Sequence, residues 1–433
     1  MDTIDLFPDT VEIHNGHISH IGGCSLKELA SKYGTPLYIY DAVTFAWNYR
    51  YLHDLLADTY PGNFDIAYAS KAYLSLPFAR KLANLETSID VASISELEIV
   101  LKAGIPPCRI HLHGNNKSEA EIHKAIDLQI ESIVVDSLDE LHFVEEISRK
   151  MNRIPAIWLR ITPDITVDTH KAVQTGHSAS KFGIPVGNGE AEEAIKLGLS
   201  SDAVRLTGLH THLGSQLFDS DRYSEAINIL FNLCHKTDWQ PEIISPGGGW
   251  GVPYTTGSPD TDPSDWIVAI SHTVQNCCEK YQIKLPKIII EPGRWLVAKA
   301  GVSIYSVGST KSLPTGEWIA AVDGGMSDNP RPALYDAHYS AVVIGNSADR
   351  PVVPTRLVGR FCESGDELIH QIDLPRLERG DIVAIPVSGA YQLSMSSNYN
   401  LADRPCVLWL DNGKVEVMQK REKASQSNWW LGE

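Results

Sequence analysis

The chain has 433 residues, with 54 acidic and 37 basic side chains and a formal net charge of −17. Its length exceeds that of a typical single domain, so we expect one large domain and a smaller one. The strong negative charge argues against nucleic acid or an anionic membrane as a partner.

The compartment can be inferred from the N-terminus and from the cysteines. Residues 1–5 lack the basic start and apolar core of a secretion signal, and no uncharged apolar run is long enough to span a bilayer. The 7 cysteines form no C-x-x-C pair and are odd in number, which argues against a zinc site and a disulfide framework. We therefore expect a cytoplasmic protein with no metal centre.

Short β-branched runs alternate with longer amphipathic segments between residues 64 and 291. Clear helical patterns occupy residues 76–84, 95–103, 118–128 and 138–150. About eight strand–helix pairs predict an α/β fold with a (β/α)8 TIM barrel, whose strand ends meet at one rim where functional sites form. The predicted strands end near Ser70, Val91, His113, Asp136, Ile161, His212, Ser245 and Glu291.

The pattern changes after about Val307, where short β-rich segments are separated by Gly, Pro and Asp turns. These segments, at residues 319–323, 341–344, 356–358, 381–385 and 407–410, predict a mostly β C-terminal domain. Residues 11–18 have the pattern of a hairpin that could complete it. We expect a barrel domain at residues 38–308 and a discontinuous β domain made of residues 1–37 and 309–433.

Lys71 follows the apolar run at residues 64–70 and is the first candidate for chemistry. A lysine at the carboxyl end of a buried strand is expected to be desolvated, and its amine can then form a Schiff base with pyridoxal phosphate. A lone lysine at a strand end more often reaches solvent along its apolar stem. The prediction therefore depends on the other residues at the rim.

Three further patterns lie at predicted strand ends. The glycine run at residues 245–251 and the turn at residues 213–215 could offer backbone N–H groups to a phosphate, although turns explain most glycine runs. His212 is either a core histidine or a flat ring stacked on an aromatic cofactor. Glu291 could hold a proton on a pyridine nitrogen or form an ion pair with Arg294.

These residues belong to a series of motifs that resembles the diaminopimelate decarboxylase family. The motifs follow in order along essentially the whole chain, at residues 68–72, 113–118, 134–137, 180–183, 210–216, 291–294, 323–326, 331–335, 362–366 and 389–391. The resemblance implies an alanine-racemase-like fold and decarboxylation of meso-diaminopimelate to L-lysine with pyridoxal 5′-phosphate. It also implies a homodimer whose active sites are shared between subunits.

The resemblance further implies a role for individual residues. Lys71 would carry the cofactor, His212 would stack on its ring, and Glu291 would pair with its pyridine nitrogen. Cys362 and Glu363 would come from the neighbouring subunit, with Cys362 as proton donor or else as a thiol without a chemical role. Cofactor contacts are implied for Asp90, Ser215, Gly248, Gly249, Gly293, Arg294 and Tyr391, and substrate contacts for Arg294, Arg331, Tyr335, Glu363 and Tyr391.

The substrate can also be argued from charge. Diaminopimelate has an amino acid group at both ends, so the enzyme must recognise the carboxylate that it keeps, and a guanidinium such as that of Arg331 does this bidentately. Arg331 would repel ornithine, arginine or lysine, whose side chains end in a cation. The alternatives are a decarboxylase of that ornithine, arginine or lysine type, a racemase, a barrel enzyme without a cofactor, and a non-catalytic regulatory homologue.

Overall fold

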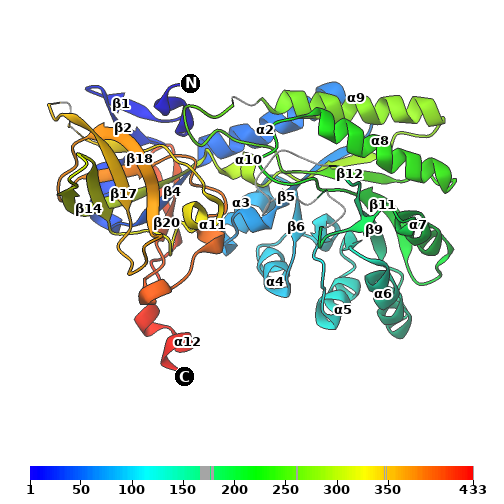
Figure 1. Cartoon of the computed structure of the whole chain (residues 1–433). Helices are drawn as coiled ribbons and strands as arrows, with labels where there is room; N and C mark the ends of the chain where they lie inside the picture. The colour runs from blue at the N-terminus through cyan, green and yellow to red at the C-terminus, as the bar shows by residue number, and fades with distance from the viewer. Residues whose placement is uncertain (166–175, 177–179, 260–261, 346, 348, 433) are drawn as a thin grey trace. The chain divides into compact units, whose positions relative to one another are not determined.

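The computed structural model describes residues 1–165, 176, 180–259, 262–345, 347 and 349–432. They belong to two compact units (Figure 1). Unit 1 comprises Met1–Tyr49, Val252–Asp260 and Arg294–Glu433, and unit 2 comprises Arg50–Gly251 and Thr261–Gly293. The boundaries expected from the sequence, at residues 38 and 308, stay a prediction.

Unit 2 contains a closed barrel of eight parallel strands, which confirms the predicted fold class. Each strand pairs in parallel with the next, and β13 pairs with β5 to close the ring. A short strand, β10 (Ile184–Pro185), adds to β9 outside the ring. The barrel strands are β5 (Phe64–Ala69), β6 (Ser88–Val91), β7 (Ile110–Leu112), β8 (Ser132–Val135), β9 (Ala156–Thr162), β11 (Arg205–His210), β12 (Ile243–Gly247) and β13 (Lys287–Ile290).

The helices that follow these strands start where the sequence provides a capping residue. In each of four successive helices, a serine hydroxyl accepts a hydrogen bond from the third helical N–H, which satisfies one of the unpaired donors at the helix start. These caps are Ser75, Ser93, Ser118 and Ser137. The helices of the barrel are α3 (Leu76–Asn84), α4 (Ile94–Lys102), α5 (Glu119–Leu128), α6 (Leu138–Met151), α7 (Glu190–Ser200), α8 (Asp221–Lys236) and α9 (Pro263–Tyr281), and α2 (Ala42–Thr59) precedes β5.

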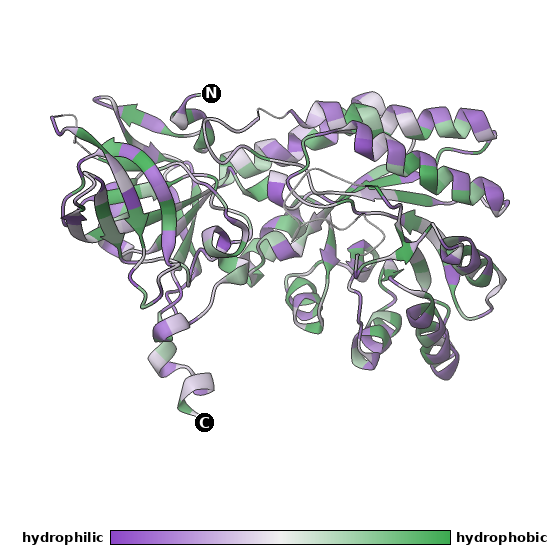
Figure 2. Cartoon of the chain, viewed as in Figure 1, coloured by the Kyte–Doolittle hydropathy of each residue, from purple (hydrophilic) through white to green (hydrophobic). Residues whose placement is uncertain are grey.

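Burial of apolar side chains holds the barrel together. The interior packs Ala67, Val134, Trp158, Ile243 and Ile289 from five different strands against one another. The helices bury one face, as α6 does with Leu141, Val144 and Ile147, and leave polar residues on the other (Figure 2). The polar rim at the strand ends is therefore carried by a rigid scaffold.

Unit 1 contains a nine-stranded mixed sheet, as the mostly β pattern predicts. Its main path runs β18-β17-β15-β14-β4-β20-β21, and β19 joins β14 to β16. The N-terminal strand β4 (Leu37–Asp41) lies between β14, antiparallel to it, and β20, parallel to it. The other strands are β14 (Gly301–Ser312), β15 (Trp318–Val322), β16 (Val342–Ile344), β17 (Val352–Val358), β18 (Glu367–Pro375), β19 (Ile382–Ile385), β20 (Cys406–Asp411) and β21 (Lys414–Gln419).

The predicted N-terminal hairpin exists and belongs to unit 1. Strands β1 (Glu12–His14), β2 (His17–Ile21) and β3 (Cys24–Ser25) form a separate three-stranded sheet, followed by α1 (Leu26–Tyr33). Buried residues of this segment, including Ile18, Ile21 and Leu26, pack into one apolar cluster with Val302 and Leu408 of the large sheet. The N-terminal segment therefore completes the β domain through side-chain packing.

Short helical turns make up the remaining regular structure of the part of the chain that the structure describes. Among the described residues, no helix combines the length and the apolar character that crossing a bilayer requires. The short elements are η1 (Thr3–Leu6), η2 (Ser70–Ala72), η3 (Pro107–Arg109), α10 (Arg294–Val297), α11 (Arg331–Tyr335), η5 (Leu393–Met395), η6 (Tyr399–Leu401), η7 (Ala424–Gln426) and α12 (Asn428–Leu431).

Candidate active site

Lys71 lies in η2, directly after barrel strand β5. Its neighbours Ser70 and Ala72 are buried, but the lysine side chain itself is exposed in the single chain. The expectation that the strand end desolvates Lys71 is therefore wrong for the chain alone, because η2 carries the residue beyond the last strand position. Its positive charge nevertheless acts on two rim residues: burial raises the pKa of Asp90 and Lys71 opposes that rise, whereas burial lowers the pKa of His212 and Lys71 adds to that fall, which places the amine at the same rim.

Glu291, immediately after β13, is a buried carboxylate held by two hydrogen bonds. Its Oε2 lies 2.9 Å from Nε2 of His210, and its Oε1 accepts from the hydroxyl of Ser245 at 2.6 Å. Burial by itself raises the pKa of Glu291, but the charge and hydrogen bond of His210 and the bond from Ser245 outweigh it, so the pKa is held well below its usual value. Glu291 is therefore an ionised carboxylate inside the barrel mouth.

His210 and Ser245 were not singled out by the sequence analysis. They pair across strands β11 and β12, so both lie beside the end of β13. The available signal was weak, since each is a polar residue within an otherwise apolar strand end. The ion pair considered between Glu291 and Arg294 stays a prediction, because these residues belong to different units, and within unit 2 Glu291 pairs with His210.

Asp90, at the end of β6, is a second carboxylate of the rim, and its pKa is shifted in the opposite direction to that of Glu291. Burial raises its pKa well above the usual value, and the negative charge of Glu291 adds to this effect. Nε2 of His113 lies 3.5 Å from Asp90 Oδ1 and 3.8 Å from Glu291 Oε1. Burial lowers the pKa of His113, so the ring is neutral. The pKa values of two carboxylates at one rim are thus shifted in opposite directions.

The glycines of residues 247–249 allow the backbone to approach closely. A Cβ on Gly248 would lie 2.0 Å from the carbonyl oxygen of Glu291, and one on Gly249 would lie 2.0 Å from that of Gly214. Gly247 and Gly249 have φ angles of +74° and +101°, which favour glycine. The sequence prediction of a tight, donor-bearing turn agrees with this geometry.

His212 lies against this turn, and the Gly248 N–H approaches its Nδ1 at 3.4 Å. Burial lowers the pKa of His212 well below its usual value, with Lys71 as the next cause, so the imidazole is neutral. Ser215 is half-buried in the neighbouring turn, and a Cβ on Gly293 would lie 3.1 Å from Ala69 and Ala72. His212, Ser215 and the glycines thus line the same barrel mouth as Lys71.

The rim residues fit pyridoxal phosphate. Asp90 Oδ1 and His113 Nε2 are buried and have no hydrogen-bond partner within the described part of the chain. Such atoms are costly unless a ligand or water satisfies them. An exposed amine, an ionised carboxylate and a small-residue turn would suit the aldehyde, the ring nitrogen and the phosphate of the cofactor, respectively.

A second cluster, in unit 1, surrounds the predicted substrate arginines. Arg294 donates a hydrogen bond to the hydroxyl of Tyr254, and its guanidinium lies 4.6 Å from the ring centroid of Tyr391. Arg331 donates to the hydroxyl of Tyr339 and lies 4.5 Å from the ring centroid of Tyr254. Both arginines are buried. Aromatic faces and phenol oxygens therefore compensate for the loss of water around two cations.

Tyr254 and Tyr339 connect this cluster and were missed in the sequence. Their rings meet edge-on at a centroid distance of 5.2 Å. Burial alone would raise the pKa of Tyr254, but Arg294 and Arg331 outweigh it and the pKa is lowered. Buried tyrosines are common in cores, so only the contact with Arg294 and Arg331 identifies these as site residues.

Cys362 and Glu363 lie on an exposed loop of unit 1. The Cys362 N–H donates to the side chain of Asn400 at 3.0 Å, and the buried Asp366 accepts from the N–H groups of Met326 and Phe361 at 2.6 and 2.7 Å. Asp366 therefore fixes the base of the loop. Tyr335, at the end of α11, is half-buried, and its hydroxyl lies 3.9 Å from the sulfur of Met395.

Known proteins are similar to this chain in sequence and fold. Residues 50–298 match the family Pyridoxal-dependent decarboxylase, pyridoxal binding domain. Diaminopimelate decarboxylase of Bacillus methanolicus is 39% identical over 427 residues, covering 98% of each chain, and that of Bacillus subtilis is 38% identical over 94% of this chain and 93% of its own. The crystal structure of diaminopimelate decarboxylase from M. jannaschii in complex with L-lysine has a TM-score of 0.90 at 33% identity, covering 96% of each chain.

Proposed function

The chain belongs to the diaminopimelate decarboxylase family of pyridoxal-dependent enzymes, and on that basis we propose that it converts meso-diaminopimelate to L-lysine and carbon dioxide. It is a carboxy-lyase that uses pyridoxal 5′-phosphate, as the motifs predicted. The buried, ionised Glu291 at the barrel rim is the observation that carries the proposal, because it suits a protonated pyridine ring.

Different barrel residues would contact different parts of the cofactor. Bound pyridoxal phosphate supplies an electron sink that accepts the electron pair left when a carboxylate departs. Lys71 would anchor it covalently, Glu291 would keep a proton on its ring nitrogen, and His210 and Ser245 keep Glu291 ionised. His212 would lie against the ring. Ser215, Gly248, Gly249 and Gly293 would surround the phosphate, and Asp90, whose pKa burial raises, would contact the cofactor.

Arg331 would recognise the carboxylate that the substrate keeps. Tyr254 and Tyr339 fix its guanidinium, and although burial opposes this, the facing tyrosines raise the pKa of Arg331, so it stays charged. A fixed cation attracts a distal carboxylate and repels a distal ammonium group. This favours diaminopimelate over ornithine, arginine and lysine. Arg294, Tyr335 and Tyr391 complete the proposed substrate contacts.

The exposed loop of Cys362 and Glu363 supports a homodimer with shared sites. Reactive or substrate-binding groups on an exposed loop need a surface to complete their environment, and a second copy of the chain would provide it. Glu363 would then accept the distal ammonium group and Cys362 would return a proton to the substrate carbon. Unpaired thiols at all seven cysteines support a cytoplasmic location.

Substitution of Lys71 tests the proposal. Lys71→Ala should abolish carbon dioxide release from meso-diaminopimelate and allow the cofactor to be removed by dialysis, because the covalent anchor is lost. Lys124→Ala, which removes a half-buried helical lysine paired with Glu98, should leave both unchanged. Normal turnover in Lys71→Ala, or faster release from ornithine than from meso-diaminopimelate in the parent enzyme, would contradict the proposal.

A further inference from the structure

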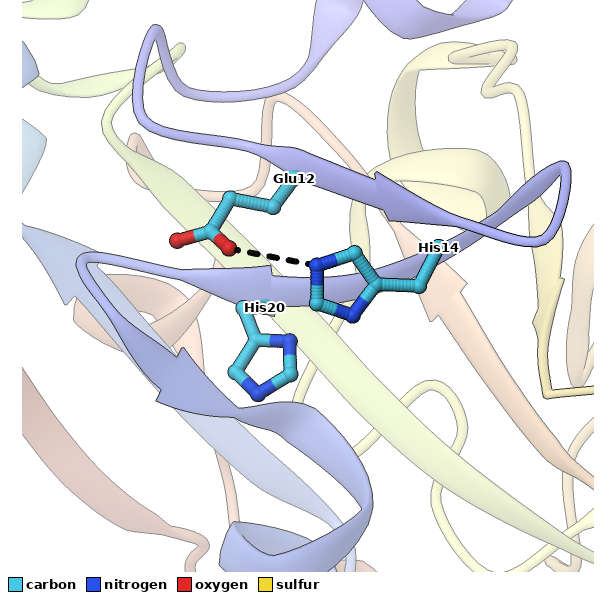
Figure 3. A group of neighbouring side chains, drawn as sticks. All are labelled: Glu12, His14 and His20. Carbon is cyan, nitrogen blue, oxygen red and sulfur yellow. Dashed lines mark ion pairs between the residues drawn. The ribbon is translucent and has the colours of Figure 1, made fainter.

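Two groups of side chains among the described residues bring three potential metal ligands within 4.8 Å of one another. One consists of His113, His210 and Glu291 and belongs to the cofactor site. The other lies on the N-terminal hairpin and consists of Glu12, His14 and His20 (Figure 3). The proposed decarboxylation uses no residue of this hairpin.

The hairpin sequence explains why these three side chains share one face. Asn15 and Gly16 have φ angles of 52° and 78°, as a two-residue type I′ turn requires, and this turn pairs His14 with His17. Alternation along β1 places Glu12 on the same face as His14. Regular pairing would then place Ser19 opposite Glu12.

A β-bulge changes this register. Glu12 pairs with His20, whereas Ile13 pairs with Ile18, so Ser19 is the extra residue on β2. Bulges redirect a side chain relative to regular pairing. The bulge therefore brings the His20 imidazole to the side of Glu12 and His14, while Ile18 stays buried in the core of unit 1.

The geometry of the three side chains is close to that of a coordination site. Glu12 Oε2 lies 3.6 Å from His14 Nε2, and the His14 and His20 rings are 5.0 Å apart between centroids (Figure 3). Ligands of a tetrahedral zinc ion lie about 3.4 Å from one another at metal–ligand distances near 2.1 Å. The ligand atoms here lie within 4.8 Å of one another, so an adjustment of up to about 1.4 Å remains, which the exposed Glu12 and His14 can make by rotation about their χ angles.

We propose that Glu12, His14 and His20 form a surface binding site for a divalent transition metal ion, with zinc as the ion to test. Two imidazoles and one carboxylate are a ligand set that zinc accepts, and a water molecule can occupy the fourth position. The hydroxyl of Ser19 lies 2.9 Å from Nδ1 of His20 and would orient that ring, leaving Nε2 to face the metal. The ion would link β1 to β2.

A zinc titration tests this proposal on the full chain loaded with pyridoxal phosphate. Isothermal titration calorimetry with zinc chloride should show about one ion per chain bound at this site. His14→Ala and His20→Ala should each weaken this binding by about tenfold or more, since even indirect partners of a metal ligand contribute that much. Circular dichroism without metal should show unchanged folding, because His14 is exposed and His20 is half-buried.

His142→Ala is the matched control. His142 has an exposed ring, 60% accessible, and lies 3.5 Å from the carboxylate of Glu145, compared with 59% and 3.6 Å for His14 and Glu12, but it has no second histidine in a metal-ligand group of the described residues. Its zinc binding should equal that of the parent. Absence of binding in the parent would overturn the proposal. So would equal affinities in the parent, His14→Ala and His20→Ala, which would place the ion elsewhere.

Discussion

Replacement of Glu291 by glutamine is the most informative test of the barrel site. The substitution keeps the shape of the side chain but removes its negative charge. The carboxylate accepts from His210 at 2.9 Å and from Ser245 at 2.6 Å. Hydrogen bonds to charged groups contribute about 1.5–3 kcal/mol each. A glutamine can keep one as acceptor, so the free energy of unfolding should fall by roughly 1.5–3 kcal/mol.

The effect on catalysis should be larger than the effect on folding. Without the negative charge, the proton on the cofactor ring nitrogen loses its partner, and charge that develops during decarboxylation is no longer stabilised. Loss of one such electrostatic group typically lowers kcat by about 10²–10³-fold. We expect a fall of that size in carbon dioxide release from meso-diaminopimelate, with the Michaelis constant and the cofactor content little changed.

Glu140→Gln separates a catalytic effect from a structural one. Glu140, on helix α6, is also a buried carboxylate of the barrel, paired with Lys117 at 2.9 Å, but it is not among the residues proposed to contact cofactor or substrate. This variant should lose stability and keep its turnover per folded, cofactor-loaded chain. If Glu291→Gln, with cofactor bound, retained turnover within about threefold of the parent, the assignment of Glu291 to the ring nitrogen would be refuted.

Three further predictions follow from the structure. Arg331→Ala should raise the Michaelis constant for meso-diaminopimelate by about tenfold or more while cofactor affinity stays unchanged, because a charged hydrogen-bond partner is lost; an unchanged Michaelis constant would remove Arg331 from the substrate site. Cys362→Ala should slow turnover by about 10²-fold or more with cofactor retained, and an unchanged rate would show that the thiol has no role. Burial raises the pKa of Asp328 to about 6. The stability that the protonated Asp328 carboxyl gives the folded state is therefore fully present below about pH 4 and is lost as pH rises through about 6. Between about pH 4 and pH 7, the free energy of unfolding of the parent, measured with urea, should therefore fall by about 3 kcal/mol relative to that of Asp328→Asn. A difference between the two proteins that does not change with pH would contradict the raised pKa.

The barrel could be read from the sequence because its signals are local. Apolar strands of three to seven residues and serine-capped helices repeat with the spacing that the fold requires, and the predicted and observed strand ends agree within about two residues. The β domain was predicted less completely. β14 starts at Gly301, six residues before the predicted change in pattern, and β18 and β21 lack a regular alternation of buried and exposed positions.

The candidate site residues that could be predicted are likewise those with a local sequence signal. The type and order of residues singled out Lys71, His212, Glu291 and the glycine turn, which lie at one barrel rim, and their roles stay a prediction. The partners of Glu291 depend on which residues of β11 and β12 lie beside the end of β13, and sequence spacing does not determine that register. The contact of Tyr254 with both arginines likewise arises only when distant segments of the chain fold together.

The position of β4 in the sheet of unit 1 has a consequence for synthesis. Residues 37–41 leave the ribosome well before both neighbouring strands of β4, and every one of them is buried in the folded protein. One neighbouring strand ends at Ser312 and the other at Asp411, so this segment of the nascent chain must wait until residue 411 is made before both of its edges are paired. Such a segment is prone to aggregate while it waits. Yield in a cell-free translation system should therefore depend on chaperones that shield the emerging N-terminal region.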